Sequence, residues 1–190
     1  YLNGLYLYNE QKDIFENVKL QVEGQDIKDI NYIKEDKQGV LWLATNEKGL
    51  CTYNPQTKEV ISYRHNSLKS GDQILSNYIQ TLCFGKDGLI WIGTGGAGVS
   101  CYNSKTNVFT DYTKQNNSLN GNDAYAIVED QFQNIWIGTR DGLNYINRES
   151  NTIVSYTPKD GLPNSIICGI QIAPDNNLWI STNGGLSLFD

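Results

Sequence analysis

The chain has 190 residues, of which 39% are hydrophobic and 19% charged, and its formal net charge is −6 at pH 7. This hydrophobic content is enough for a packed core, which excludes a wholly disordered chain. The acidic balance argues against a nucleic-acid partner, because phosphate binding requires a basic surface. No run of 18 apolar residues is present, so we expect no membrane contact by this segment. Because the first residue is Tyr1 and not Met, we expect a piece of a longer polypeptide.

One pattern recurs along the whole chain. A Trp between apolar residues stands at its centre, at Trp42, Trp91, Trp136 and Trp179. Nine residues before each Trp stands an aliphatic residue, and shortly after each Trp comes Gly followed by Leu or Val. The aliphatic residues are Ile33, Leu82, Ile127 and Ile170, and the glycines are Gly49, Gly98, Gly142 and Gly185. Four short apolar runs separated by turn residues, repeated about every 40–50 residues, are typical of β-propeller blades.

In chain order, the pattern divides the sequence into five pieces. Residues 1–26 supply the third and fourth strands of a first blade. Complete blades follow at 27–65, 66–112 and 113–156, and residues 157–190 supply the first three strands of a last blade. We therefore predict an all-β fold, an arc of about four blades of four antiparallel strands, from a propeller of about seven blades. A β-sandwich is the alternative all-β interpretation, but it does not explain the recurring unit. Trp42, Trp91, Trp136 and Trp179 are predicted to fill the spaces between blades.

These residues resemble the two-component regulator propeller repeat. Its pattern is Leu-x-x-Asn-x-Ile-x-x-Ile-x-Glu-Asp-x-x-Gly-x-Leu-Trp-Ile-Gly-Thr-x-x-Gly-Leu-x-x-Tyr-Asn, and residues 75–103 and 119–147 follow it almost throughout. Some positions depart from it. Gly85 and Ala173 replace the acidic residue six positions before Trp, and Ala44 stands where Gly is usual.

The resemblance implies a place in a larger receptor. Proteins with this repeat are sensor regions of Bacteroidetes hybrid two-component systems. The family implies a periplasmic module of an inner-membrane-anchored, homodimeric sensor that detects glycan-derived oligosaccharides. The signal would pass to a cytoplasmic histidine kinase and a transcriptional output in the rest of the parent protein. This chain itself is predicted to have no enzymatic activity, because its single histidine, His65, lies in a loop without partners for catalysis.

Other motifs are expected to be structural. Residues 93–98 match the dinucleotide fingerprint G-x-G-x-x-G, but a strand is expected after them where the fingerprint requires a helix. Cys51, Cys83, Cys101 and Cys168 are not in C-x-x-C spacing, so we predict four free thiols, no metal and no cofactor. If a disulfide formed, Cys51 with Cys83 would be the least implausible pair.

The connections between blades are the most variable segments, and they share one face with the turns between second and third strands. Polar loops on a rigid scaffold are where binding usually occurs. The candidate ligand-binding residues on this face are Arg64, His65, Asp72, Asn122, Asp123, Arg140, Asp141 and Asn164. For each of them alone, a solvated loop side chain is the default interpretation. Tyr32, Tyr78 and Tyr125, on or near first strands, could stack on sugars near the axis or fill gaps between blades.

Three functions remain open at this point. The first is a ligand-sensing module, and the second is a structural propeller that spaces or dimerises the receptor. The third is an enzyme similar to the streptogramin lyases, which is the weakest because no general-base constellation is visible.

Overall fold

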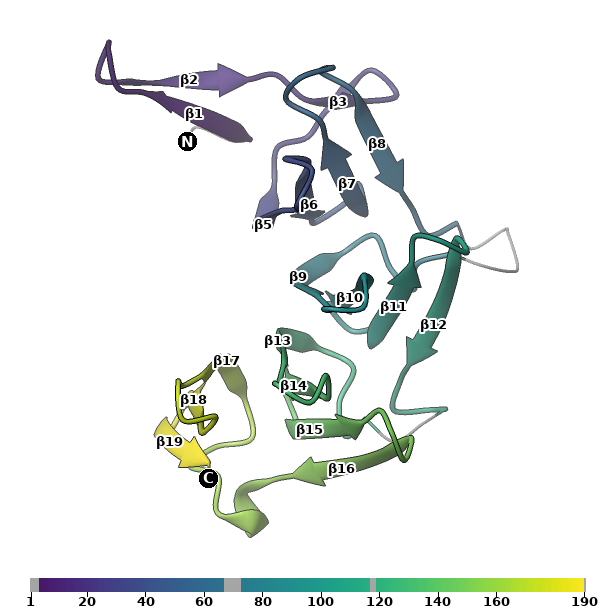
Figure 1. Ribbon diagram of the computed structural model, residues 1–190, viewed down its shortest axis with the longest axis vertical. Coiled ribbons are helices and arrows are strands. Elements are labelled where there is room, and N and C mark those ends of the chain that lie inside the picture. The colour runs from purple at the N-terminus through teal and green to yellow at the C-terminus, as the bar shows by residue number, and fades with distance from the viewer. Residues whose placement is uncertain (1–3, 67–72, 117–118, 190) are drawn as a thin grey trace.

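The computed structural model describes residues 4–66, 73–116 and 119–189, and its sheets are all antiparallel (Figure 1). Blade 1 contains β5 (Ile30–Glu35), β6 (Leu41–Thr45), β7 (Leu50–Tyr53) and β8 (Val60–Tyr63). Blade 2 contains β9 (Ile79–Phe84), β10 (Leu89–Thr94), β11 (Val99–Asn103) and β12 (Val108–Tyr112). Blade 3 contains β13 (Ala124–Glu129), β14 (Ile135–Thr139), β15 (Gly142–Asn147) and β16 (Thr152–Tyr156).

Smaller sheets flank the three blades. The hairpin β1 (Leu5–Asn9) and β2 (Ile14–Val18) precedes them, followed by the short hairpin β3 (Gln21–Val22) and β4 (Gln25–Asp26). A 3₁₀ turn, η1 (Pro158–Asp160), leads to the last sheet, β17 (Ile167–Ile172), β18 (Leu178–Thr182) and β19 (Gly185–Phe189). The predicted arc of four-stranded antiparallel blades, a partial β-propeller, is confirmed.

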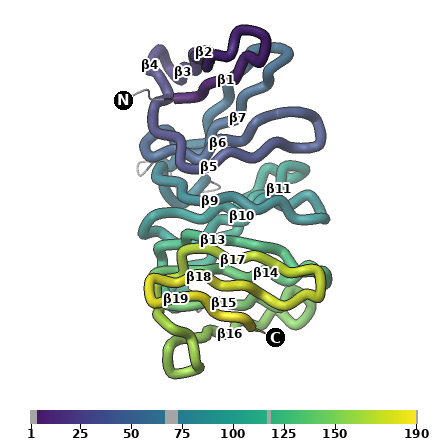
Figure 2. The backbone as a smooth tube through the Cα atoms, turned by 90° about the vertical axis from the view of Figure 1, so that its left-hand side faces the viewer, coloured from purple at the N-terminus to yellow at the C-terminus, as the bar shows by residue number. Residues whose placement is uncertain are grey.

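The sheets follow one another along an arc, with their first strands on its inner side (Figure 1). β5, β9, β13 and β17 lie next to one another in that order, and the fourth strands β8, β12 and β16 form the outer rim. In the view turned by 90°, the purple N-terminal hairpin and blades 1 to 3 follow one another down the picture, and the yellow last sheet is seen in front of blade 3 (Figure 2). Because the four strands of a blade are antiparallel, successive turns lie alternately at the two ends of the sheet. We call the end with the second-to-third turns and the interblade connections the loop face, and the opposite end the turn face.

Tryptophan and aliphatic side chains form the core between neighbouring blades. Trp42 is 8% exposed and packs with Ile90 and Tyr102 of blade 2, with Phe84 meeting its ring edge-on at 6.0 Å. Trp91 is 1% exposed and lies in the cluster shared by blades 2 and 3. The same holds for Trp136, at 9%, between blade 3 and the last sheet. The prediction of buried interblade indoles is thus confirmed for these three.

For Trp179 the same prediction is wrong, because its side chain is 43% exposed. It occupies the equivalent position on β18, where it pairs with Gln171 of β17 and Leu188 of β19. The difference comes from its neighbours. Within the described residues, no further sheet packs on this side of β17–β19, so the indole has nothing to cover it.

Candidate ligand-binding site

Backbone hydrogen bonds join the segments of the loop face to one another. Gly49 N donates to Asn77 O at 3.1 Å, and Gly98 N donates to Asn122 O at 2.8 Å. Each of these bonds joins the second-to-third turn of one blade to the connection that enters the next blade. Both glycines have positive φ, and a Cβ on either would come within 2.4 Å of a carbonyl oxygen, so a side chain does not fit there. The repeated Gly therefore allows the interblade connections to lie directly on the turns.

Buried side chains anchor these connections to the core. In the described part of each connection an aliphatic residue is buried, namely Ile74, Leu119 and Leu162. The residue after Ile74 is held by a polar pair, because Leu75 N donates to Ser100 Oγ at 3.2 Å and Ser100 Oγ donates to Asp111 at 2.8 Å. Burial raises the pKa of the Asp111 carboxyl, although the hydrogen bond from Ser100 acts in the opposite direction. The loop face is therefore built on a fixed base.

Four of the predicted ligand-binding residues lie together at blade 3. Asn122 accepts a hydrogen bond from Lys114 N at 2.8 Å, and Asp123 O accepts one from Arg140 N at 3.1 Å. Asp141 lies 4.0 Å from Lys114 Nζ, with both side chains more than half exposed. The Asn122 side chain thus supports its own loop, whereas Arg140 and Asp141 present their side chains to solvent.

The remaining candidates are spread over neighbouring connections. Arg64 pairs with Glu23 at 2.9 Å, and His65 Nδ1 lies 3.0 Å from Ile74 O. Asn164 accepts a hydrogen bond from Ile166 N at 2.9 Å and so stabilises a local turn. Asp72 lies outside the described residues. The structure therefore places the described candidates on one face, but in three groups.

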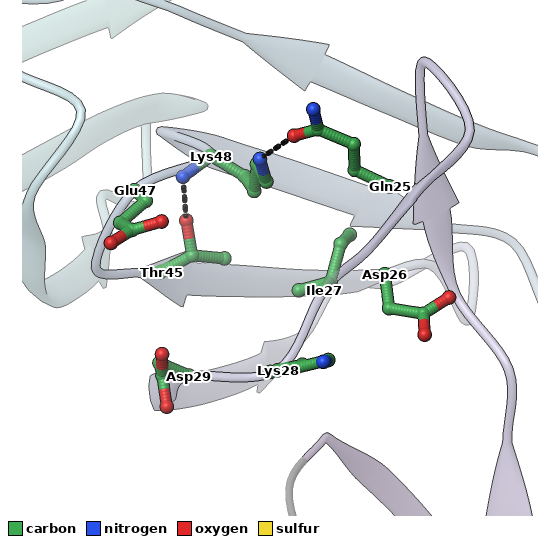
Figure 3. Close-up of a pocket in the computed structure, with 8 residues that line it drawn as sticks. All are labelled: Gln25, Asp26, Ile27, Lys28, Asp29, Thr45, Glu47 and Lys48. Atoms are coloured by element: carbon green, nitrogen blue, oxygen red, sulfur yellow. Dashed lines mark hydrogen bonds between the residues drawn. The ribbon is translucent and has the colours of Figure 1, made fainter.

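A hollow of about 260 Å³ lies on the loop face beside blade 1 (Figure 3). Most of its lining is charged or polar: Gln25, Asp26, Lys28, Asp29, Thr45, Glu47 and Lys48, with Ile27 as the apolar member. The Lys48 side chain donates to Gln25 Oε1, while Lys48 N donates to Thr45 Oγ1 at 2.9 Å. Carboxylates, amines and an amide around a concave site can bind a ligand that carries many hydroxyl groups.

None of these lining residues was among the predicted site residues. The sequence predicts the third and fourth strands of a first blade within residues 1–26, and in the structure residues 21–26 form a separate hairpin on the loop face. Its turn has positive φ at both Glu23 and Gly24, as a two-residue type I′ hairpin requires. The Glu-Gly pair between Val22 and Gln25 was the available signal, although it is weaker than Asn-Gly.

A second, larger hollow of about 590 Å³ runs along the inner strands β9, β13 and β17. Tyr32 and Tyr125 line it, together with Lys34, Cys168 and Gln171. The first strands have an irregular register near the loop face, which leaves Asn31, Tyr125 and Cys168 as bulged residues. Such bulges re-aim a side chain, and Cys168 Sγ and Asn31 Nδ2 accordingly reach the second-to-third turns at Asn183 and Asn46. Tyr78 is placed differently, because its ring lies over Gly95.

The thiols are free in the structure, with Cys51, Cys83 and Cys101 buried and Cys168 exposed. Burial raises the pKa of the three buried thiols, to about 12 for Cys101. Within the described ranges, no group of three or more His, Cys, Asp or Glu side chains could hold a metal ion. In the same part of the chain, no helix has the length and apolar character that crossing a membrane would need.

Comparison with solved structures gives similar propellers. The extracellular domain of a putative hybrid two component system from B. thetaiotaomicron is 23% identical with a TM-score of 0.76, over 98% of this chain and 25% of that one. A second such domain from that organism is 24% identical with a TM-score of 0.51, over 97% and 29%. An inactive virginiamycin B lyase from Staphylococcus aureus is 19% identical with a TM-score of 0.66, over 91% and 59%. At these identities the likeness shows the fold.

The chain spans about a quarter of the length of the two extracellular domains. A search of curated proteins gives no significant match. The model of the two component regulator propeller family matches residues 24–47, 73–96, 118–141 and 161–184, about half of the chain, with one match at each Trp. The chain therefore belongs to the two component regulator propeller family.

Proposed function

We propose that this chain is an extracytoplasmic ligand-sensing module of a hybrid two-component sensor. The observation that carries the proposal is the polar hollow on the loop face of a propeller of this family, lined by Lys48, Asp29 and Glu47. Two similar structures are extracellular domains of putative hybrid two component systems, which supports the same assignment. In the proposed receptor the module lies in the periplasm, and a homodimeric parent protein passes the signal to a cytoplasmic kinase and a transcriptional output.

An oligosaccharide from glycan breakdown is the proposed ligand. Sugar hydroxyls donate to carboxylates and accept from amines, and the hollow offers both kinds of group within one concavity. Tyr32, which is 39% exposed, and Tyr125 line the separate hollow along the inner strands, where an aromatic ring can stack on a sugar.

Titration calorimetry with a panel of oligosaccharides tests the proposal. Binding should weaken at least tenfold in Lys48→Ala and Asp29→Asn, because each substitution removes a polar contact in the hollow. Lys105→Ala is the matched control, since Lys105 is exposed in a third-to-fourth turn on the opposite, turn face. Equal binding by all three variants would contradict the placement of the site.

A structural or dimerising role is the second candidate. The faces at both ends of the arc expose large apolar side chains, with Leu7 64%, Phe15 67% and Leu186 63% exposed. Surfaces of this kind favour association with another protein surface. If no oligosaccharide raises the melting temperature while the chain self-associates, the scaffold assignment is favoured.

A further inference from the structure

The acidic residue six positions before Trp has two functions in blades 1 and 3. One oxygen of Asp36 accepts two backbone N–H groups of the first-to-second turn, each at 2.9 Å. Its other oxygen accepts the indole N–H of Trp42 at 2.8 Å. Asp130 repeats this arrangement, with its turn bonds at 2.9 Å and Trp136 Nε1 at 3.4 Å. In both blades, the carboxylate satisfies a buried indole within its own sheet.

Blade 2 has Gly85 at this position, so no carboxylate stands there to accept the turn N–H groups and the indole N–H. Asp87 takes over the turn, because its Oδ1 accepts Leu89 N at 3.0 Å. The indole is left without an acceptor: Trp91 is 1% exposed, and its Nε1 has no hydrogen-bond partner among the described residues. A buried unsatisfied donor is costly, so this N–H is expected to find an acceptor.

A carboxylate from blade 3 lies beside Gly85. The Glu129 side chain is 4% exposed, and its Oε2 accepts Lys86 N at 2.9 Å. Its Oε1 has no hydrogen-bond partner in the described part of the chain and lies 3.2 Å from where a Cβ on Gly85 would stand. The nearest cation, Arg148 Nη1, is 3.9 Å from this oxygen, which is too long for a direct hydrogen bond. An unsatisfied acceptor thus lies beside position 85, the position whose carboxylate binds the indole in blades 1 and 3.

We propose that Glu129 is the acceptor for the Trp91 indole across the blade junction, through one buried water molecule. The water would stand beside Gly85, where a Cβ would lie 3.2 Å from Glu129 Oε1 and 2.6 Å from Asp87 Oδ1. It accepts the hydrogen from Trp91 Nε1 and donates one of its own to Glu129 Oε1. A water with two or more such partners is a normal part of a protein interior. Glu129 and Lys86 also line the hollow along the inner strands.

This arrangement joins two blades, whereas Asp36 and Asp130 act within one. It adds to other bonds at the same junction: Arg148 pairs with Asp87 at 2.6 Å, and Lys86 Nζ donates to Asp130 O at 3.1 Å. At the junction of blades 1 and 2, Phe84 and Ser104 occupy the positions of Glu129 and Arg148, and a hollow of about 250 Å³ lies there instead. The proposal therefore makes the junction of blades 2 and 3 the more tightly connected one.

Nuclear magnetic resonance of the ¹⁵N-labelled chain tests the proposal on the unmodified protein. The Trp91 indole N–H should show a cross-peak to a long-lived water, whereas the indoles of Trp42 and Trp136 should show none, because carboxylates accept them directly. A Trp91 indole without this cross-peak would overturn the water bridge, and so would equal water cross-peaks at all three indoles.

Variants identify the acceptor. In Glu129→Leu the Trp91 indole should lose its water cross-peak and shift its resonance, whereas Glu129→Gln, which retains an acceptor oxygen, should keep the cross-peak. Glu35→Leu is the matched control, because Glu35 holds the same position on β5 but is exposed. If Glu129→Leu does not fold, the water cross-peak of the Trp91 indole in Glu129→Gln and in the unmodified protein still tests the water bridge. A Trp91 signal identical in Glu129→Leu and the unmodified chain would refute the role of Glu129.

Discussion

The environment of each tryptophan predicts how much stability it contributes. Trp42 and Trp179 occupy equivalent positions on second strands, but Trp42 is 8% exposed and Trp179 is 43% exposed. Replacing either with Ala removes the same atoms from the chain. A difference in the free energy of unfolding between the two variants therefore measures the covering by the neighbouring sheet.

For Trp42→Ala the loss is large. A buried indole removes roughly 150–250 Å² from water, which at about 25 cal/mol per Å² corresponds to about 4–6 kcal/mol. The substitution also removes the stacking on Tyr63 at 5.9 Å and leaves one oxygen of Asp36 without its donor. Measured truncations of this kind cost about 3–5 kcal/mol. With nearly half of its surface exposed, Trp179→Ala should cost roughly half as much.

Urea unfolding followed by far-ultraviolet circular dichroism provides the comparison, with the slope m checked in each variant. An unchanged m shows that only stability has changed, which matters because repeat proteins can unfold in parts. An equal loss in the free energy of unfolding for Trp42→Ala and Trp179→Ala would refute the inference that the neighbouring sheet accounts for the difference. So would a loss below about 1 kcal/mol for Trp42→Ala, which would indicate an indole not packed in the interface.

Further predictions concern turns, thiols, pH and association. Asp36→Ala should cost about 2–4 kcal/mol in urea unfolding, because it frees two turn N–H groups and a buried indole N–H, and an unchanged midpoint would contradict this. Thiol titration should find one fast-reacting group, Cys168, and four after denaturation without reductant; a total of two would indicate a disulfide. Although burial raises it, the pKa of Asp87 is held below 3.8 by hydrogen bonds from Leu89 N and Arg148. The ionised Asp87 carboxylate should therefore stabilise the folded chain above about pH 4, and this stabilisation should disappear as pH falls through the folded-state pKa. In Arg148→Met the urea midpoint should depend less on pH over this range. Light scattering at high concentration should show pairing between chains through the apolar ends of an open arc, and a monodisperse monomer would contradict it.

The fold could be predicted from the sequence because each unit repeats the same local signals. The aliphatic residue nine before Trp, the Trp itself and the following Gly mark three successive strands, and β5 begins and ends where expected, at Ile30 and Glu35. Four copies in register leave little choice of topology. The exposure of Trp179 could not be predicted in this way, because a repeat pattern describes the residue and not what covers it.

The site could be predicted only as a face of the molecule. The order of strands puts interblade connections and second-to-third turns at one end, and the backbone bonds of Gly49 and Gly98 agree with this. The hollow beside Lys48 depends on the hairpin at residues 21–26, and the described parts of the other units contain no equivalent hairpin. Features that occur once give no repeat from which to infer them.

Departures from the repeat carry the information that the repeat itself cannot. Gly85 could be read from the sequence as a missing carboxylate, but the sequence did not indicate which group would replace it. In the structure, Asp87 takes one function, and Glu129 lies beside the place of the other. These two residues come from different blades, so a loss within one sheet is offset by a contact between sheets. An acceptor supplied by the next blade stabilises the junction between two blades, whereas an acceptor within the blade stabilises that blade alone. A departure from the consensus is therefore a reason to examine the adjacent blade for the compensating residue.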